Sequence, residues 1–483
     1  MRADVVVVGS GAGGSACADR IAAAGLDVLV LEMGAAESPE TFTQREEDMF
    51  PRLFQDAGAR ATLDGAIAVM QGKGLGGSTL HNLNLCKRVP EELLDRWAED
   101  RGLPELPERL SRAYAAVEAD LAVTEVLDTQ LNRNNRLFRA GVESLGWENG
   151  RLKHNRQGCI GSGFCELGCA YDAKMNAARV LLPRAEDRGA RLMTGVRVER
   201  ILHRFGRARG VSATSAEGRV TVEARAVVLA ASATGSPALL LASGLGDAHR
   251  QVGAHLHLHP GGTVGGSFGE PVDGWKGIPQ GWECTELLDP LQGGCWLLPV
   301  FGHPVTTAAL LPGIGAEHTR MMARYDHLAA LTPMLHDHSS GRVLADRRGR
   351  PLIRYRLGPR DRSHMAVGLV AGARILLAAG AEKVVLPLAV PVEIRTPAEL
   401  ERLELNVRRL DPPLAAVHPM GTLRMGSDPR SSATDEFGRL HCARGVWVAD
   451  GSLMPSSTGG PPQLSIYALG RMVGEAIAED LGR

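Results

Sequence analysis

A glycine-rich run near the start of the chain has the spacing of a phosphate-binding turn. Gly9, Gly11 and Gly14 follow four consecutive valines, and Glu32 ends a second apolar run. The first glycine permits a tight turn, the second lets a pyrophosphate approach the backbone, and the third lets the next helix pack close to the strand. Glu32 can accept hydrogen bonds from ribose hydroxyls. We predict that this segment binds the ADP portion of a dinucleotide.

His418 is the candidate general base. A histidine with its ordinary pKa of about 6.5 is neutral at working pH and can take a proton from a hydroxyl group. His418 lies in the segment His418-Pro419-Met420-Gly421-Thr422, where a proline and a Gly-Thr turn restrict the backbone. The chain contains 15 His, so residue type alone does not select this one.

Three cysteines form one closely spaced group. Cys159, Cys165 and Cys169 follow the pattern C-x5-C-x3-C, and thiolates at such spacing can hold an iron–sulfur cluster. Structural thiols or a local disulfide are the alternatives. The three residues are therefore candidate cluster ligands, whereas the other five cysteines are dispersed and expected to be inert.

The elements that must position these groups begin with a β-α-β unit. Residues 5–8 are apolar on both faces, as in a buried parallel strand, and an Ala-rich stretch over 15–24 predicts a helix. A strand over 27–31 completes the unit. Helices are also predicted between about 89 and 121 and over about 464–481.

Residues 263–410 have a different pattern. Alternating polar and apolar residues over 341–346 and 351–356, joined by a turn at Arg348-Gly349, predict a β-hairpin, and a helix is predicted from about 361 to 379. We interpret this insert as a domain built on an antiparallel sheet with helices, which covers the substrate side of the cofactor.

Composition excludes several classes of protein. The 483 residues include 54 Lys+Arg and 55 Asp+Glu, a balance that argues against nucleic-acid binding. No window of 18 apolar residues predicts a membrane span, and the four valines are too short for a signal peptide. Eight cysteines are too few for a disulfide scaffold of this length. These features predict a cytoplasmic protein.

Later segments make the chain similar to one known family. They read GLGGST from Gly74, SATGSPALLLASGLG from Ser232, and HPMGT from His418 followed by VADGS from Val448. With these segments in this order, the chain resembles the glucose–methanol–choline (GMC) oxidoreductases over nearly its whole length. The resemblance implies an α/β fold with a Rossmann-like, glucose oxidase-like FAD-binding domain and a second, substrate domain.

The resemblance also implies domain bounds and cofactor contacts. The FAD-binding domain would be discontinuous and formed by residues 1–90, 185–262 and 411–483. A helical, cysteine-containing cover segment would span 91–184, and a substrate domain would span 263–410. FAD would contact the ADP-binding residues above and a further set: Gly76, Gly77, Ser78, His81, Asn82, Val198, Asp450, Gly451, Pro462 and Gln463. His418 matches the active-site histidine of the family.

Two positions leave questions about the chemistry. The family usually carries a second catalytic Asn or His where this chain has Pro461, which has no side-chain donor or acceptor. Gln463 or the Ser456-Ser457-Thr458 run would supply the missing hydrogen bond, His418 would act alone, or the chemistry would be of a non-redox lyase type. His81 matches a position that bonds covalently to flavin in some members, with packing against the flavin as the alternative.

The predicted function is therefore FAD-dependent oxidation of an alcohol CH–OH group to an aldehyde or ketone. A sugar, amino sugar or other polar alcohol is the favoured substrate, because aromatic residues in 263–410 could stack against a sugar ring and a locally acidic stretch would suit an amino group. The scarcity of long apolar runs there disfavours a sterol or long-chain alcohol. Oxygen, a quinone or a redox protein would accept the electrons. An NAD-dependent Rossmann enzyme would account for residues 4–32 but not for the later segments.

Overall fold

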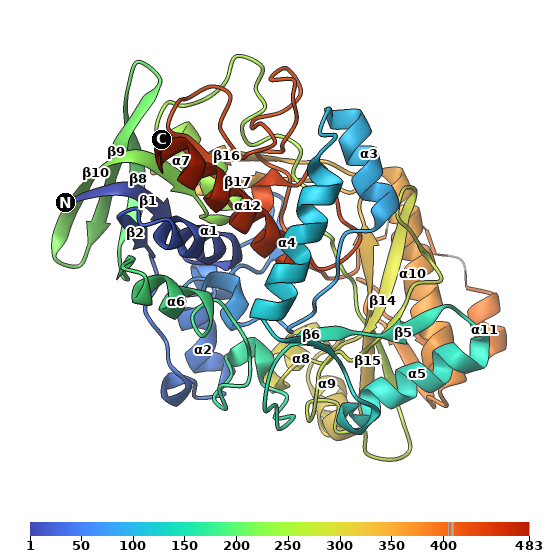
Figure 1. The fold of residues 1–483 in the computed structure, drawn as a ribbon. Coiled ribbons are helices and arrows are strands. Elements are labelled where there is room, and N and C mark those ends of the chain that lie inside the picture. Colours follow the sequence, from blue (N-terminus) through green and yellow to red (C-terminus); the bar gives the residue numbers. More distant parts are fainter. Residues whose placement is uncertain (404, 407–409, 483) are drawn as a thin grey trace.

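Two large sheets organise the chain (Figure 1). The computed structural model describes residues 1–403, 405–406 and 410–482. In the first sheet, β1 lies between β2 and β10 and is parallel to both, with Val5 opposite Val28 on one side and Ala226 on the other. The strands of this sheet, in order, are β7 (Arg191–Met193), β2 (Val28–Leu31), β1 (Arg2–Val8), β10 (Gly218–Leu229), β9 (Arg207–Ser215) and β8 (Arg197–Arg204), and β21 (Val446–Val448) also pairs with β10.

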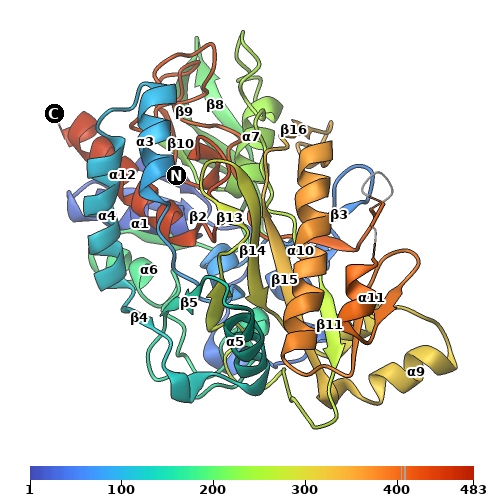
Figure 2. The same cartoon turned by 90° about the vertical axis from the view of Figure 1, so that its right-hand side faces the viewer.

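The second sheet is antiparallel and has eight strands. Helices α5 (Arg133–Leu145) and α10 (Pro359–Ala378) pack against it, as Figure 2 shows for α10 beside β14 and β15. Its strands are, in order, β19 (Val392–Ile394), β18 (Lys383–Leu386), β11 (Val264–Ser267), β15 (Leu328–His336), β14 (Gly293–Pro299), β12 (Trp282–Cys284) and β5 (Asn149–Arg151), and β13 (Leu288–Asp289) pairs with β14.

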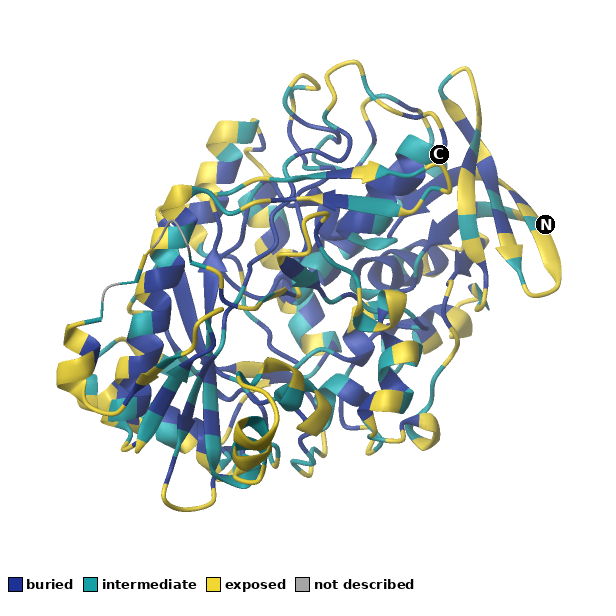
Figure 3. Cartoon of the chain, turned by 180° about the vertical axis from the view of Figure 1, so that it is seen from behind, coloured by how far each residue is buried: buried dark blue, intermediate teal, exposed yellow. Residues whose placement is uncertain are grey.

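Helices cover the first sheet and tie distant parts of the chain together. Helix α1 (Ala12–Ala23) packs against α12 (Gln463–Gly482), and α12 packs against α4 (Leu106–Asp120). The remaining helices are α2 (Glu46–Leu53), α3 (Glu91–Arg101), α6 (Leu181–Asp187), α7 (Ser232–Ala242), α8 (Pro304–Leu310), α9 (Ala316–Met322) and α11 (Pro397–Glu401). Both sheets are buried at their centres (Figure 3).

The predicted elements can be compared with those observed. The predicted mixed α/β class with a Rossmann-like unit is confirmed, and so are the first two strands, α1, α10 and α12. The predicted hairpin forms as β16 (Arg342–Ala345) and β17 (Pro351–Arg354), but these strands make a separate two-stranded sheet. The described part of the chain contains no helix that is long and apolar enough to cross a membrane.

Two further pairs of short strands lie outside the two large sheets. They are β3 (Ile67–Val69) with β20 (Leu414–Ala416), and β4 (Val123–Glu125) with β6 (Lys153–Asn155). Strand β20 directly precedes His418, so its pairing with β3 helps to fix the position of the candidate base.

Candidate active site

One cavity of about 1330 Å³ is lined by residues of both large sheets and of the segments between them. This volume exceeds the roughly 300–1,000 Å³ typical of a site for one small ligand. At one end lie Gly9, Gly11 and Glu32, and the same cavity is lined by His418 and Pro461. The cavity is therefore large enough for a dinucleotide cofactor and a substrate.

Each glycine at this end of the cavity is needed for a different structural reason. Gly9 has a φ of +101°, and an added Cβ would lie 2.3 Å from the carbonyl oxygen of Ala230. At Gly14 an added Cβ would lie 2.1 Å from the carbonyl oxygen of Gly9. At Gly11, by contrast, an added Cβ would meet nothing within 4 Å. Gly9 and Gly14 thus allow the strand, turn and helix to pack, whereas Gly11 keeps open the space that a pyrophosphate needs at the start of α1.

Glu32 is buried at the end of β2 and holds the surrounding turns together. Its carboxylate accepts hydrogen bonds from the backbone N–H groups of Ser10 (3.1 Å) and Gly34 (2.9 Å) and from the hydroxyl group of Ser10 (2.7 Å). The backbone N–H of Gly74 lies 3.3 Å from the same carboxylate. Glu32 therefore connects the first glycine turn to the GLGGST segment and also lines the cavity.

The GLGGST segment delivers His81 and Asn82 to the cavity wall. His81 packs against Phe54, with 4.1 Å between ring centroids, and burial lowers the pKa of His81 to about 3. Its Nε2 atom is buried and has no hydrogen-bond partner among the described residues. The His81 residue is part of the cavity lining, although Nε2 itself is buried.

A buried lysine, which the sequence interpretation missed, supports this loop. The ammonium group of Lys174 donates hydrogen bonds to the backbone carbonyls of Leu80 (3.0 Å), Asn82 (2.6 Å) and Cys165 (2.8 Å). It thereby joins the loop that carries His81 to the segment that carries the cysteines. Nothing in the local sequence around Lys174 distinguishes it from a surface lysine, so only the fold reveals this role.

The C-terminal part of the chain completes the wall. Burial raises the pKa of Asp450, whose carboxylate accepts hydrogen bonds from the Ser236 hydroxyl and from the Ser452 backbone N–H (2.8 Å). Gln463 begins α12, and its side chain accepts a hydrogen bond from Asn82 (2.7 Å) and donates one to the Leu85 carbonyl (2.7 Å). Gln463 thus positions Asn82 but has its polar atoms occupied.

His418 lies on the cavity wall, partly buried, and burial lowers its pKa to about 4. Its Nδ1 atom is 3.4 Å from Nδ1 of His259. That contact leaves Nε2 of His418 as the nitrogen that can accept a substrate proton. Pro461 also lines the cavity and supplies no polar side chain there.

The predicted site residues thus come together from distant parts of the chain, although Gly14 and Gly76 are outside the lining and only support it. The lining includes Gly9, Gly11, Glu32, Gly77, Ser78, His81, Asn82, Val198, His418, Asp450, Gly451, Pro462 and Gln463. The sequence interpretation missed His259 and its neighbours. The alternation of histidines at 255, 257 and 259 before Pro260 was a signal that could have revealed them.

The three clustered cysteines lie beside the site. Cys159, Cys165 and Cys169 line a separate small cavity together with Arg156 and Lys174, and all three are free thiols. Within the described residues, no group of three or more His, Cys, Asp or Glu side chains could hold a metal ion. The structure therefore gives no support to the iron–sulfur cluster.

Comparison with known proteins identifies the family. Two family models described as GMC oxidoreductase match residues 50–261 and 337–470, and a model of the NAD(P)-binding Rossmann-like domain matches residues 7–64. The chain is 38% identical over 481 residues to an uncharacterised GMC-type oxidoreductase of Mycobacterium tuberculosis, covering 98% of this chain and 75% of that protein.

The chain is also similar to a plant enzyme in sequence and to a solved structure in fold. The chain is 28% identical to long-chain-alcohol oxidase FAO3 of Arabidopsis thaliana, with 100% of this chain and 68% of that protein covered. Its fold matches the crystal structure of pyridoxine 4-oxidase from Mesorbium loti with a TM-score of 0.75 at 20% identity, over 99% of both chains. From the matched segments, the identity and the shared fold, we conclude that this chain is an enzyme of the GMC oxidoreductase family.

Proposed function

We propose that this enzyme binds FAD and oxidises an alcohol, with His418 as the general base. The observation that carries the proposal is the single cavity that joins Gly11 and Glu32, at the nucleotide-binding turn, to His418. The open space at Gly11 and the presence of His81 in the cavity wall fit a cofactor with a pyrophosphate at one end and a ring system at the other. Bound FAD would supply a hydride acceptor.

Residues of the chain would bind the cofactor and accept the substrate proton. Glu32 would bind the ribose, the N-terminus of α1 would bind the pyrophosphate, and the loop of Ser78, His81 and Asn82 would lie against the flavin. His418 would take the hydroxyl proton on Nε2 while the hydride leaves the adjacent carbon. A neutral imidazole is required for this step, and burial keeps His418 neutral at ordinary pH by lowering its pKa to about 4.

Apolar side chains in the cavity wall support a substrate with an apolar portion. Its lining includes Trp296, Leu298, Val300, Phe301, Met334, Leu310, Leu311 and Met321. Apolar walls bind apolar groups by removing their surface from water, at about 25 cal/mol per Å². We infer that these apolar side chains favour an alkyl or aryl alcohol over the sugar or amino sugar that the sequence suggested, because a sugar hydroxyl group in contact with them has no hydrogen-bond partner there.

An anaerobic flavin-reduction assay tests the proposal. Protein loaded with FAD is mixed with primary alcohols of rising chain length, with a glucosamine-type amino sugar and with glucose, and the loss of flavin absorbance is followed. We expect reduction to become faster with chain length. Faster reduction by the sugars would contradict the substrate class, and reduction by none of the alcohols would contradict the function. Free FAD with the same alcohols is the control.

A second candidate function follows from Pro461. Without a second catalytic side chain at that position, lyase chemistry that needs no net redox change is the alternative. Redox turnover with an artificial electron acceptor would exclude it, whereas product formation with oxidised flavin throughout would support it. The same turnover assay, supplied in turn with oxygen, a quinone or a redox protein, would identify the electron acceptor.

A further inference from the structure

A chain of buried polar groups leads from His418 through His259, which also lines the cavity, to Ser457 and Asp337. Nε2 of His259 lies 2.8 Å from the hydroxyl oxygen of Ser457, and that hydroxyl donates to Oδ1 of Asp337 at 2.9 Å. His259, Ser457 and Asp337 are each at most 2% exposed. We propose that these three residues form a relay that fixes the tautomer of His418 and stabilises its protonated form, in place of the second catalytic side chain missing at Pro461.

The backbone brings the four members together from four segments. The stretch around His259 pairs with residues on either side of His418, through His257 with Met420 and Gly261 with Ala415, and it also pairs with the end of β15. Asp337 directly follows β15, and Ser457 lies in the loop before α12. Because His259 lies between the two paired positions, its ring is held against that of His418.

His259 has a strained backbone. Its φ is +51°, a left-handed conformation that a non-glycine residue rarely adopts. The backbone N–H groups of Leu258 and His259 donate to the carboxylate of Asp337 at 3.0 and 3.3 Å, which holds the conformation in place. Such strain persists where the surrounding structure fixes it, and it concentrates at functional sites.

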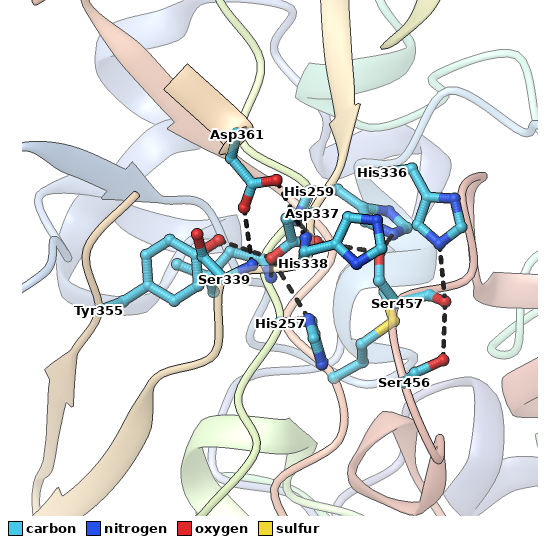
Figure 4. Close-up of polar contacts among 12 residues, drawn as sticks. His257, His259, His336, Asp337, His338, Ser339, Tyr355, Asp361, Ser456 and Ser457 are labelled. Carbon is cyan, nitrogen blue, oxygen red and sulfur yellow. Dashed lines mark hydrogen bonds and ion pairs between the residues drawn. The ribbon is translucent and has the colours of Figure 1, made fainter. Parts of the chain in front are cut away.

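Asp337 is the fixed anion of the relay. Figure 4 shows it among His257, Tyr355 and Ser457, and its carboxylate also accepts a hydrogen bond from the Tyr355 hydroxyl at 2.6 Å. Burial acts to raise the pKa of Asp337, but the nearby His257 and His259 and the Tyr355 hydroxyl outweigh it and leave the pKa well below its usual range. With the two backbone N–H groups and the hydroxyls of Tyr355 and Ser457 all donating to its two oxygens, Asp337 acts as an ionised carboxylate that only accepts hydrogen bonds.

This requirement sets the direction of every proton. Since Asp337 cannot donate, the single proton of Ser457 points to it, and the Ser457 oxygen must accept from Nε2–H of His259. Nδ1 of His259 then accepts from Nδ1–H of His418, which leaves Nε2 of His418 unprotonated and able to take a proton from the substrate. The backbone N–H of Thr458 also points at Nε2 of His259, at 3.3 Å, a longer contact than the 2.8 Å to Ser457. If Nε2 accepted that N–H, the tautomers of both histidines would be reversed, so the order proposed here requires the shorter contact to Ser457 to prevail.

The relay rests on the proposed function of His418 as the base, but it consists only of side chains of this protein and needs no cofactor to form. When His418 accepts the hydroxyl proton, its new positive charge is balanced through His259 and Ser457 by Asp337. The other groups that face the relay are His336, whose ring centroid is 6.4 Å from that of His259, and His257, 3.6 Å from Asp337. Burial lowers the pKa values of His259 and His336, so neither competes for the proton.

Two substitutions that each remove one hydrogen bond to Asp337 form the test. Ser457→Ala breaks the relay, whereas Tyr355→Phe removes a bond of similar length outside it. We expect Ser457→Ala to slow flavin reduction by the alcohol about 10- to 100-fold in kcat with little change in KM, and to move the acidic limb of the pH profile. Tyr355→Phe should lower stability but leave the rate within about twofold, and Ser457→Thr should restore it. Equal rates in Ser457→Ala and Tyr355→Phe would overturn the proposal.

A second measurement does not depend on activity. In protein labelled with ¹⁵N-histidine, the signals of His418 are assigned by their loss in His418→Gln. We expect protonated Nδ1 and unprotonated Nε2 in the parent protein, and a mixture of tautomers in Ser457→Ala. The opposite tautomer, or no change in Ser457→Ala, would overturn the relay. If no alcohol reduces the flavin, the proposed function fails, and this spectrum alone decides whether the relay exists.

Discussion

The two ends of the cavity are built in different ways. At the nucleotide end, Gly9, Gly11 and Glu32 lie within one β-α-β unit, and the backbone does most of the work. At the reaction end, His418, His259, Asp337 and Ser457 come from four separate segments, and side chains do the work. Binding a phosphate needs only a local turn, whereas holding a base in one protonation state needs several groups that the whole fold must align.

The largest effect is expected at the nucleotide end. Gly9→Ala would place a Cβ 2.3 Å from a backbone oxygen at a φ of +101°, so we expect a loss of stability on the order of 3–5 kcal/mol and no bound flavin. Gly11→Ala is the matched control, because its Cβ meets open space. It should fold normally as apoprotein, by urea unfolding, yet bind FAD weakly. If Gly11→Ala binds FAD like the parent, the pyrophosphate does not approach this turn.

A substitution at the reaction end should separate chemistry from cofactor binding. We expect His418→Gln to lower the rate of flavin reduction about 10²- to 10⁴-fold, the range for loss of a general base, with unchanged flavin content. Stopped-flow absorbance under anaerobic conditions measures both. The exposed His249→Gln serves as the control. Loss of flavin from His418→Gln would mean that the two ends of the cavity are not independent.

The smallest expected effect is that of pH on the rate of flavin reduction. With its pKa lowered to about 4 by burial, His418 stays neutral until the solution becomes quite acidic. We expect the flavin-reduction rate to be flat from pH 8 to about pH 5 and to fall only near pH 4, as the base becomes protonated. A fall in the flavin-reduction rate near pH 6.5 would instead indicate a solvent-exposed base.

Acid should also lower the stability of the fold. Folding buries His81 and His418 in their neutral forms, whereas the unfolded chain protonates them below about pH 6.5. The unfolded state therefore binds more protons between their folded and unfolded pKa values, so stability falls as pH drops through this window. Flavin retention and circular dichroism, recorded at each pH, distinguish loss of catalysis from unfolding.

The contrast between the two ends also explains what could be predicted from sequence. The glycine turn, Glu32 and the hairpin over 342–354 follow from short-range patterns, because each is decided by neighbours along the chain. His418 was found through its resemblance to a family motif. The contacts of Lys174 and Asp337 could not be found, because burial and partners contributed by distant segments turn ordinary polar residues into structural ones.

The central position of β1 also has a consequence for how the chain folds during synthesis. Its sheet gains first β10 and later β21, which pairs with β10. The chain between them is long, because β10 ends at Leu229 and β21 begins only at Val446. At about 5–20 residues per second, a ribosome needs on the order of 10–40 s to cover this interval. For that time the apolar edge of β10 lacks its neighbour, and α1 lacks α12. The nascent enzyme thus passes through a long aggregation-prone period, in which chaperones and early capture of the cofactor would have their greatest effect on yield.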